Sequence, residues 1–122
     1  MTLGEIKELL DADVIVGEDK LAMEVKAAFA ADLMSDVLSF AKPGSILLTG
    51  LTNPLVIRTA DTMDLLAIVF VRGKRPLAEA VELATQKGIP LLATRFIMFE
   101  TCGRLYKNGI RGSITKAGES AA

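Results

Sequence analysis

The sequence predicts one α/β domain whose mainly parallel sheet is covered by helices on both faces. Three observations lead to this fold class. The 122 residues suit a single hydrophobic core. Strand and helix patterns alternate from Ser45 to Asn108, and such connections need right-handed crossovers between parallel strands. The run Leu65 to Val71 is apolar at every position, which is typical of a strand buried on both sides.

The N-terminal residues predict a short helix followed by a strand. Thr2 and Glu5 have the spacing of a capping box, and the apolar stripe that follows fits one helical face: Leu3, Ile6, Leu9 and Leu10. Val14 to Val16 then has the composition of a strand, which ends at Gly17.

The segment from Asp19 to Phe40 has two interpretations. Its alanines favour one long helix by propensity. The alternative is a strand near 25–31, a turn at Asp32 and a helix that Asp32 caps. In that case one helical face carries Met34, Val37, Leu38 and Ala41.

The middle of the chain contains clear boundary signals. Pro43-Gly44 is a turn, and Ser45 to Thr49 is a strand that stops at Gly50. Asn53 followed by Pro54 predicts an N-cap and a first helical residue, with the helix ending near Met63.

The last elements are a helix, a strand and a helix. Pro76 is expected to open a helix that Gly88 closes, with apolar positions Leu77, Ala80, Val81 and Ala84. Ile89 to Ala93 follows as a strand. Arg95 to Asn108 is an amphipathic helix that carries Ile97, Met98, Cys102, Leu105 and Tyr106. We expect a domain over 1–110 and a flexible tail over 111–122.

Composition excludes several function classes. The net charge of −1 argues against nucleic-acid and anionic-membrane partners, and no apolar run approaches the ~20 residues of a membrane span. No secretory signal is recognisable, so a cytoplasmic protein is expected. Because the chain lacks histidine, Ser-His and Cys-His pairs are excluded. We therefore expect no catalytic residues, no metal and no cofactor.

Candidate ligand-binding residues lie where the parallel strands are expected to end, because helix N-termini and free N–H groups meet there. The four loops are 32–36, 49–53, 73–75 and 94–95. The side chains and glycines expected to bind a ligand are Asp32, Ser35, Asp36, Thr49, Gly50, Thr52, Asn53, Gly73, Lys74, Arg75, Thr94 and Arg95.

Each of these features also has a structural interpretation. The 49–53 loop suits a phosphate or carboxylate, yet every strand-to-helix connection needs a turn and a cap. Lys74, Arg75 and Arg95 could hold an acidic group or be ordinary surface charges. Asp32 and Asp36 lack a third ligand for a cation. Cys102 lies on an apolar stripe and is expected to be a buried small hydrophobe.

Five segments together resemble the DRTGG domain family over about 3–110. They are Ala31-Asp32-Leu33-Met34-Ser35-Asp36-Val37, the Pro43-Gly44 turn, Thr49-Gly50, Val71-Arg72-Gly73-Lys74-Arg75-Pro76, and Gly88-Ile89-Pro90-Leu91-Leu92-Ala93-Thr94. The resemblance implies a fold similar to the N-terminal domain of HPr kinase/phosphorylase, a three-layer α/β/α sandwich with a mixed sheet. It also favours the strand and helix on either side of Asp32. The loop Thr49 to Asn53 departs from the family's name-giving pattern because it lacks the acidic-basic pair.

The resemblance implies a regulatory role, since such domains are found fused to paired CBS domains and to phosphotransacetylases. We therefore expect a non-catalytic module that senses a small anionic ligand, with nucleotides among the candidates. The alternative is a protein-interaction module without a small-molecule ligand, which forms a homo-oligomer such as a dimer or binds a partner protein. An enzyme that uses Asp32 or Asp36 with Lys74 ranks third.

Overall fold

The computed structural model describes residues 1–118. Its elements, in chain order, are α1 (Leu3–Leu9), β1 (Asp13–Val16), the 3-10 helix η1 (Glu18–Lys20), β2 (Ala27–Ala30), α2 (Met34–Phe40), β3 (Ile46–Thr49), α3 (Pro54–Thr62), β4 (Ala67–Phe70), α4 (Ala78–Lys87), β5 (Leu91–Ala93), α5 (Met98–Lys107) and β6 (Arg111–Gly112). Within this range no helix is long and apolar enough to cross a bilayer.

The strands form one mixed sheet in the order β1-β5-β4-β3-β2-β6. Among the strands of residues 1–118, five are mutually parallel and only β1 runs antiparallel, at the edge beside β5. Leu47 on β3, for example, lies in register between Phe29 on β2 and Ile68 on β4. The mainly parallel sheet expected from the strand-helix alternation is therefore confirmed.

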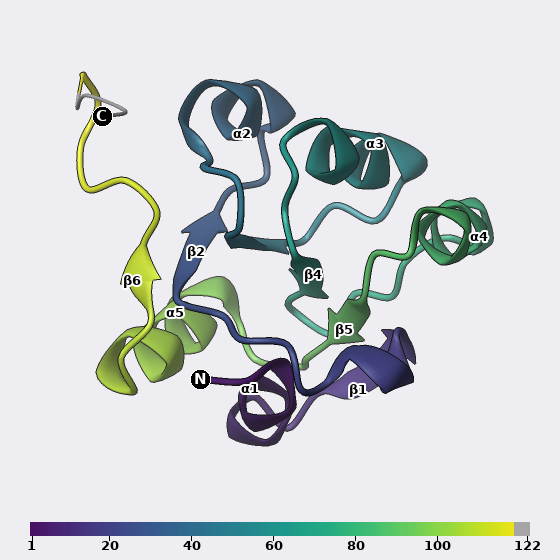
Figure 1. Ribbon diagram of the computed structural model, residues 1–122, viewed down its shortest axis with the longest axis horizontal. Coiled ribbons are helices and arrows are strands. Elements are labelled where there is room, and N and C mark those ends of the chain that lie inside the picture. The colour runs from purple at the N-terminus through teal and green to yellow at the C-terminus, as the bar shows by residue number, and fades with distance from the viewer. Residues whose placement is uncertain (119–122) are drawn as a thin grey trace.

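Helices cover both faces of this sheet (Figure 1). Helices α2, α3 and α4 pack on one face, and α1 and α5 pack on the other. The three-layer α/β/α sandwich is thus confirmed. The chain places α2, α3 and α4 on one face as it steps from β2 to β5, and then returns along the other face through α5 to β6.

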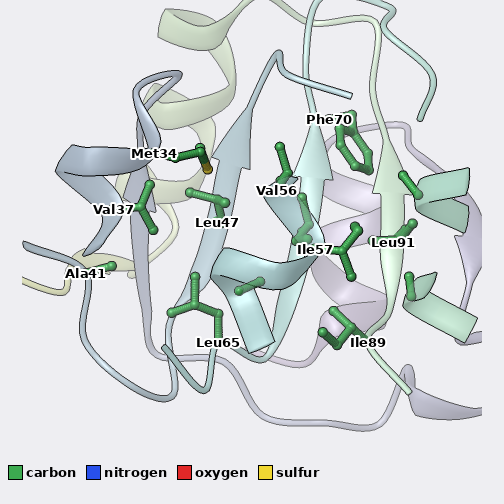
Figure 2. Packing of buried hydrophobic residues seen from close by; sticks show 14 of the residues in the cluster. Met34, Val37, Ala41, Leu47, Val56, Ile57, Leu65, Phe70, Ile89 and Leu91 are labelled. Carbon is green, nitrogen blue, oxygen red and sulfur yellow. The ribbon is translucent and has the colours of Figure 1, made fainter. Parts of the chain in front are cut away.

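Alternate residues of the central strands supply the two cores. Leu47 and Phe70 face the α2–α4 side, where they meet Met34, Val37, Val56 and Ile57 (Figure 2). Their neighbours Leu48 and Val69 face the α1–α5 side. All four residues of β4 are buried, as the apolar run at 65–71 predicts, and all four residues of β3 are buried as well. Burying one such side chain is worth about 1.5–3 kcal/mol.

The segment between 19 and 40 forms a strand and a helix, so the expectation of a split is correct. Two details are wrong. Asp32 does not cap α2: Leu33 occupies the N-cap position and makes no side-chain bond there, while Asp32 bonds elsewhere. Leu38 is 51% exposed rather than part of the buried face, because Val37 and Ala41 point to the sheet instead.

Helix boundaries elsewhere follow the caps. The Thr2–Glu5 capping box and the Asn53 cap with Pro54 are both confirmed. The expectation that Pro76 opens a helix is wrong, because α4 begins at Ala78 after an exposed N-cap, Leu77. Ile97 and Tyr106 are also exposed instead of packed.

The sheet continues into the segment expected to be a tail. Strand β6 pairs with β2 through Arg111 and Gly112, and Ser113 N–H donates to the Ala28 carbonyl at 3.1 Å. Residues 119–122 of that segment lie outside the described residues.

Candidate functional site

The parallel strands β2, β3, β4 and β5 all end at one edge of the sheet, which we call the carboxyl edge. The loops 31–33, 50–53, 71–77 and 94–97 leave the strands there. After β4 the chain passes to the α2–α4 face, and after β5 it passes to the α5 face. Ligands of open α/β sheets collect at such a divergence of neighbouring loops.

The two diverging loops are joined by backbone hydrogen bonds. Arg72 N–H donates to the Phe96 carbonyl at 2.9 Å, and Gly73 N–H donates to the Thr94 carbonyl at 3.0 Å. On the other side, Leu77 N–H donates to the Thr52 carbonyl at 2.9 Å. Three of the four predicted loops therefore lie side by side, and no open crevice separates β4 from β5.

Asp32 fixes the first predicted loop. Its Oδ1 accepts hydrogen bonds from Gly50 N–H at 2.7 Å and from the Thr49 hydroxyl at 3.1 Å. The Thr49 oxygen in turn accepts from Leu51 N–H at 3.2 Å. Because these N–H groups are already bonded, they are not available to an anion. The structure brings Asp32, Thr49 and Gly50 together, as predicted, but their hydrogen bonds fix the conformation of the loop, an arrangement that we call the loop lock.

Arg72 is the residue that the sequence reasoning missed. Its guanidinium lies directly against Gly50: a Cβ at residue 50 would stand 2.8 Å from Arg72 Nε and 2.9 Å from its Cζ. The Arg72 backbone is left-handed, with a φ of 64°, which is uncommon for a side chain of this size. Within residues 1–118 the guanidinium forms no ion pair and no hydrogen bond.

An acidic and a basic group therefore flank Gly50 although the 49–53 loop itself contains neither. Asp32 approaches from the end of β2 and Arg72 from the end of β4, on the two sides of β3. The sequence signal that could have indicated Arg72 is its position immediately after a buried strand and immediately before a glycine. In the structure that glycine, Gly73, has a positive φ.

The remaining residues of the two central loops have different surroundings. Asn53 caps α3, accepting from Leu55 N–H at 3.0 Å. Lys74 is exposed and has no ion-pair partner among the described residues. Arg75 is turned toward β1, where it pairs with Asp13. We call Gly50, Thr52, Arg72 and Lys74 the anion cradle, since they lie in adjoining loops and offer two uncompensated positive charges.

The loop after β5 is partly structural. Thr94 is buried, and its hydroxyl donates to the Leu10 carbonyl at 2.6 Å and accepts from Phe96 N–H at 3.2 Å. Arg95 is exposed and borders a hollow of about 330 Å³ with Asp11 at the end of α1. Thr94 thus ties the carboxyl edge to α1, while Arg95 presents its charge to solvent.

Ser35 and Asp36 lie on the exposed side of α2, next to the end of β2. Lys74 follows β4, so β3 and its loop separate it from Asp36. The structure therefore does not bring Asp36 and Lys74 together.

Other chemistry has little support in the described part of the chain. No group of three or more His, Cys, Asp or Glu residues that could hold a metal occurs there. Cys102 is half-buried on α5, and this burial raises the pKa of its thiol. A raised pKa keeps the thiol protonated and less nucleophilic.

Comparisons with known proteins agree with this architecture. The regulatory region of Clostridium perfringens pyrophosphatase, solved as CBS and DRTGG domains complexed with the activator diadenosine tetraphosphate, is similar with a TM-score of 0.72 and 20% identity. The similarity covers 98% of this chain and 53% of that one, so the chain spans about half the length of this neighbour. No curated protein matches. The model of the DRTGG domain matches residues 5–107, and the chain therefore belongs to the DRTGG domain family.

Proposed function

We propose that this chain is a regulatory domain that binds a small anionic ligand at the carboxyl edge and catalyses no reaction. The family assignment supports a regulatory role, and so does the solved neighbour, which is itself a regulatory region. That region is complexed with diadenosine tetraphosphate, a nucleotide that carries several phosphates. Nucleotides are therefore the first candidates for this chain.

The observation that carries the proposal is the unpaired guanidinium of Arg72 against Gly50. A guanidinium carries five N–H donors and no acceptor. Here the backbone of residues 71–74 positions the group while leaving its donors to solvent. A guanidinium in this state can bind a phosphate or carboxylate through two parallel hydrogen bonds.

The cradle differs from the site expected from the sequence. The hydroxyls of Thr49 and Thr94 already hold the loops, and the side-chain oxygen of Asn53 caps α3. Charge recognition therefore rests on Arg72 and Lys74, with Arg95 available at the neighbouring loop. Asp32 acts as a positioning residue that holds Gly50 in place.

A non-catalytic role follows from the placement of the acidic groups. The chain has no histidine. Asp32, the best-placed carboxylate, already accepts two hydrogen bonds, and Asp36 lies apart from Lys74. A carboxylate that acts as a general base must be within hydrogen-bond reach of the proton that it removes. This arrangement favours binding.

A homo-oligomeric interaction module is the second candidate. It is favoured by one observation, the large apolar side chains exposed around the carboxyl edge. The two functions are compatible, and they are distinguished by separate measurements of ligand binding and of molecular mass.

A thermal-shift screen of the full chain tests the ligand. We expect ATP, diadenosine tetraphosphate or another phosphorylated anion to raise the melting temperature by several degrees, since a ligand at 100 times its Kd adds about 2.7 kcal/mol. Sodium chloride at equal ionic strength is the control for non-specific screening of charge. A flat response to nucleotides, phosphorylated metabolites and carboxylates at millimolar concentration overturns the proposal.

A further inference from the structure

Exposed apolar side chains gather at the carboxyl edge. Seven large hydrophobic residues are exposed within the described range, and five of them stand at the N-termini of the helices that begin at this edge. These five are between 47% and 87% exposed: Leu33, Leu55, Leu77, Ile97 and Phe99. Scattered exposed apolar residues are normal, but a concentration at one end of a small domain marks an interaction surface.

Three of these residues occupy positions that normally favour polar side chains. Leu33, Leu77 and Ile97 are the N-caps of α2, α4 and α5, and none makes a side-chain capping bond. Ser, Thr, Asp and Asn are preferred there because their oxygens bond the first free N–H groups. Helix α1, which begins at the opposite edge, has the complete Thr2–Glu5 capping box. Three of the four described helices that begin at the carboxyl edge thus have an apolar N-cap residue, and α3, capped by Asn53, is the exception.

The charges along this edge are polarised. At the β2 end stand two acidic side chains, Asp32 and Asp36. Toward the β4 and β5 end stand three basic side chains that have no ion-pair partner in residues 1–118: Arg72, Lys74 and Arg95. Glu79 and Asp11 offset part of this positive charge. A surface with acid at one end and base at the other is complementary to itself when it is turned around.

We infer that the carboxyl edge is the face through which two copies of this chain associate about a two-fold axis. The edge follows the order β5, β4, β3, β2, so an axis between β3 and β4 sets the β2 end of one copy opposite the β5 end of its partner. Asp36 lies on the α2 side of the sheet and Arg95 leads to the α5 side, so the axis must be oblique to the sheet in order to exchange these sides as well. Asp36 of each copy then faces Arg95 of its partner, once on each side of the axis. The five apolar residues are buried between the copies, as an isologous interface requires. This pairing needs no ligand, although the anion cradle lies next to the axis.

Charge reversal tests the reciprocal pairing. We expect the native chain to sediment as a dimer at tens of micromolar. Asp36→Lys and Arg95→Glu should each raise the dimer dissociation constant at least tenfold, because like charges then meet on both sides of the axis. An equimolar mixture of the two variants should sediment as a heterodimer, since each of its two contacts again joins opposite charges. Within residues 1–118 neither side chain has a hydrogen-bond or ion-pair partner, so we expect both variants to keep the fold.

Two matched controls lie away from the edge. Glu82→Lys and Lys26→Glu reverse exposed charges on α4 and before β2, and they should leave dimerisation unchanged. Phe99→Ser should weaken the dimer, whereas Leu38→Ser, an exposed apolar residue in the middle of α2, should not. A native chain that stays monomeric at several hundred micromolar overturns the inference. A dimer that survives both single reversals also overturns it, because it must use another face. Neither result bears on the nucleotide screen, which reads ligand binding.

Discussion

The guanidinium of Arg72 occupies the space that a side chain on residue 50 would fill, and only glycine at that position permits this approach. The contact joins the ends of two neighbouring strands, β3 and β4. Asp32 bonds the same glycine from the other side. Gly50 is thus the point at which an acidic and a basic side chain from different strands meet the backbone.

Replacing Gly50 with alanine is expected to move Arg72 with little effect on stability. The new Cβ would collide with the end of a flexible, exposed side chain, and Gly50 has no positive φ that alanine would strain. The free energy of unfolding should change by less than about 1 kcal/mol. Affinity for the anion should fall, as measured by calorimetric titration.

A double variant isolates the cause of that loss. In an Arg72→Ala background, Gly50→Ala should lower affinity no further, because the displaced group is already absent. Additive losses would mean that Gly50 acts through something other than Arg72. Gly103→Ala is the control for glycine removal: nothing lies within 4 Å of a Cβ there, and a helical glycine replaced by alanine should stabilise the chain by about 0.5–1 kcal/mol.

Asp32→Ala is expected to destabilise the chain by about 1.5–3 kcal/mol. The substitution leaves Gly50 N–H and the Thr49 hydroxyl without their charged acceptor. Urea unfolding followed by circular dichroism measures the change. Asp36→Ala removes a carboxylate that has no side-chain partner among the described residues, and it should change stability by less than about 0.5 kcal/mol. Equal effects of the two substitutions would show that the loop lock contributes nothing.

Thr94→Val is expected to lower stability by about 1–3 kcal/mol and to leave anion affinity unchanged. The variant keeps the shape of the side chain but leaves the buried Leu10 carbonyl and Phe96 N–H without the Thr94 hydroxyl. Thermal unfolding and calorimetric titration of one sample measure the two quantities. A loss of anion affinity in a stably folded variant would contradict this prediction and would show that Thr94 contributes to the ligand site.

The capping box at Thr2 makes part of the stability depend on pH. The hydrogen bond from the Thr2 backbone N–H, followed by the bond between the two side chains, holds the pKa of Glu5 below its ordinary value of 4.5. Because the folded pKa is depressed, the contribution of Glu5 is present above 4.5 and is lost as the pH falls through the lower folded value.

Unfolding in urea at pH 6 and near pH 3 measures this contribution. Glu5→Gln should be less stable than the native chain at pH 6, and the difference should shrink at the lower pH. Thr2→Ala should cost about 1 kcal/mol at pH 6. A difference between native and Glu5→Gln that stays constant with pH would contradict the assigned pKa shift.

Sequence patterns were sufficient to predict the central strands and their helices, because the residues that are apolar in the pattern are the ones buried in the structure. Leu65 to Val71 indicates a buried strand, and Asn53-Pro54 indicates the beginning of a helix; the structure has both. Leu77 and Ile97 were misleading for a physical reason: each extends an apolar pattern at its N-terminal end but precedes the first helical turn, so it does not face the core. The residues Val14 to Val16 do not indicate that β1 runs antiparallel, since the direction of a strand within a sheet is set by tertiary packing.

The candidate site was only partly predictable for a related reason. The sequence places polar residues in loops, but it does not show which of them bond one another. Thr49 and Thr94 look like ligand groups and are instead held by Asp32 and Leu10. Arg72 looks like an ordinary surface charge until its contact with Gly50, 22 residues away in the chain, is seen.

Calorimetric titration of ATP and diadenosine tetraphosphate into native, Arg72→Ala and Arg58→Ala chains tests the central claim most directly. Arg58 is an exposed arginine on α3 without a partner in the described residues, so it matches Arg72 in charge but not in place. We predict that native and Arg58→Ala bind with the same Kd within a factor of two, and that Arg72→Ala binds at least about tenfold more weakly, the loss expected for one charge-assisted contact of 1.5–3 kcal/mol. Equal binding by Arg72→Ala and the native chain would contradict the account.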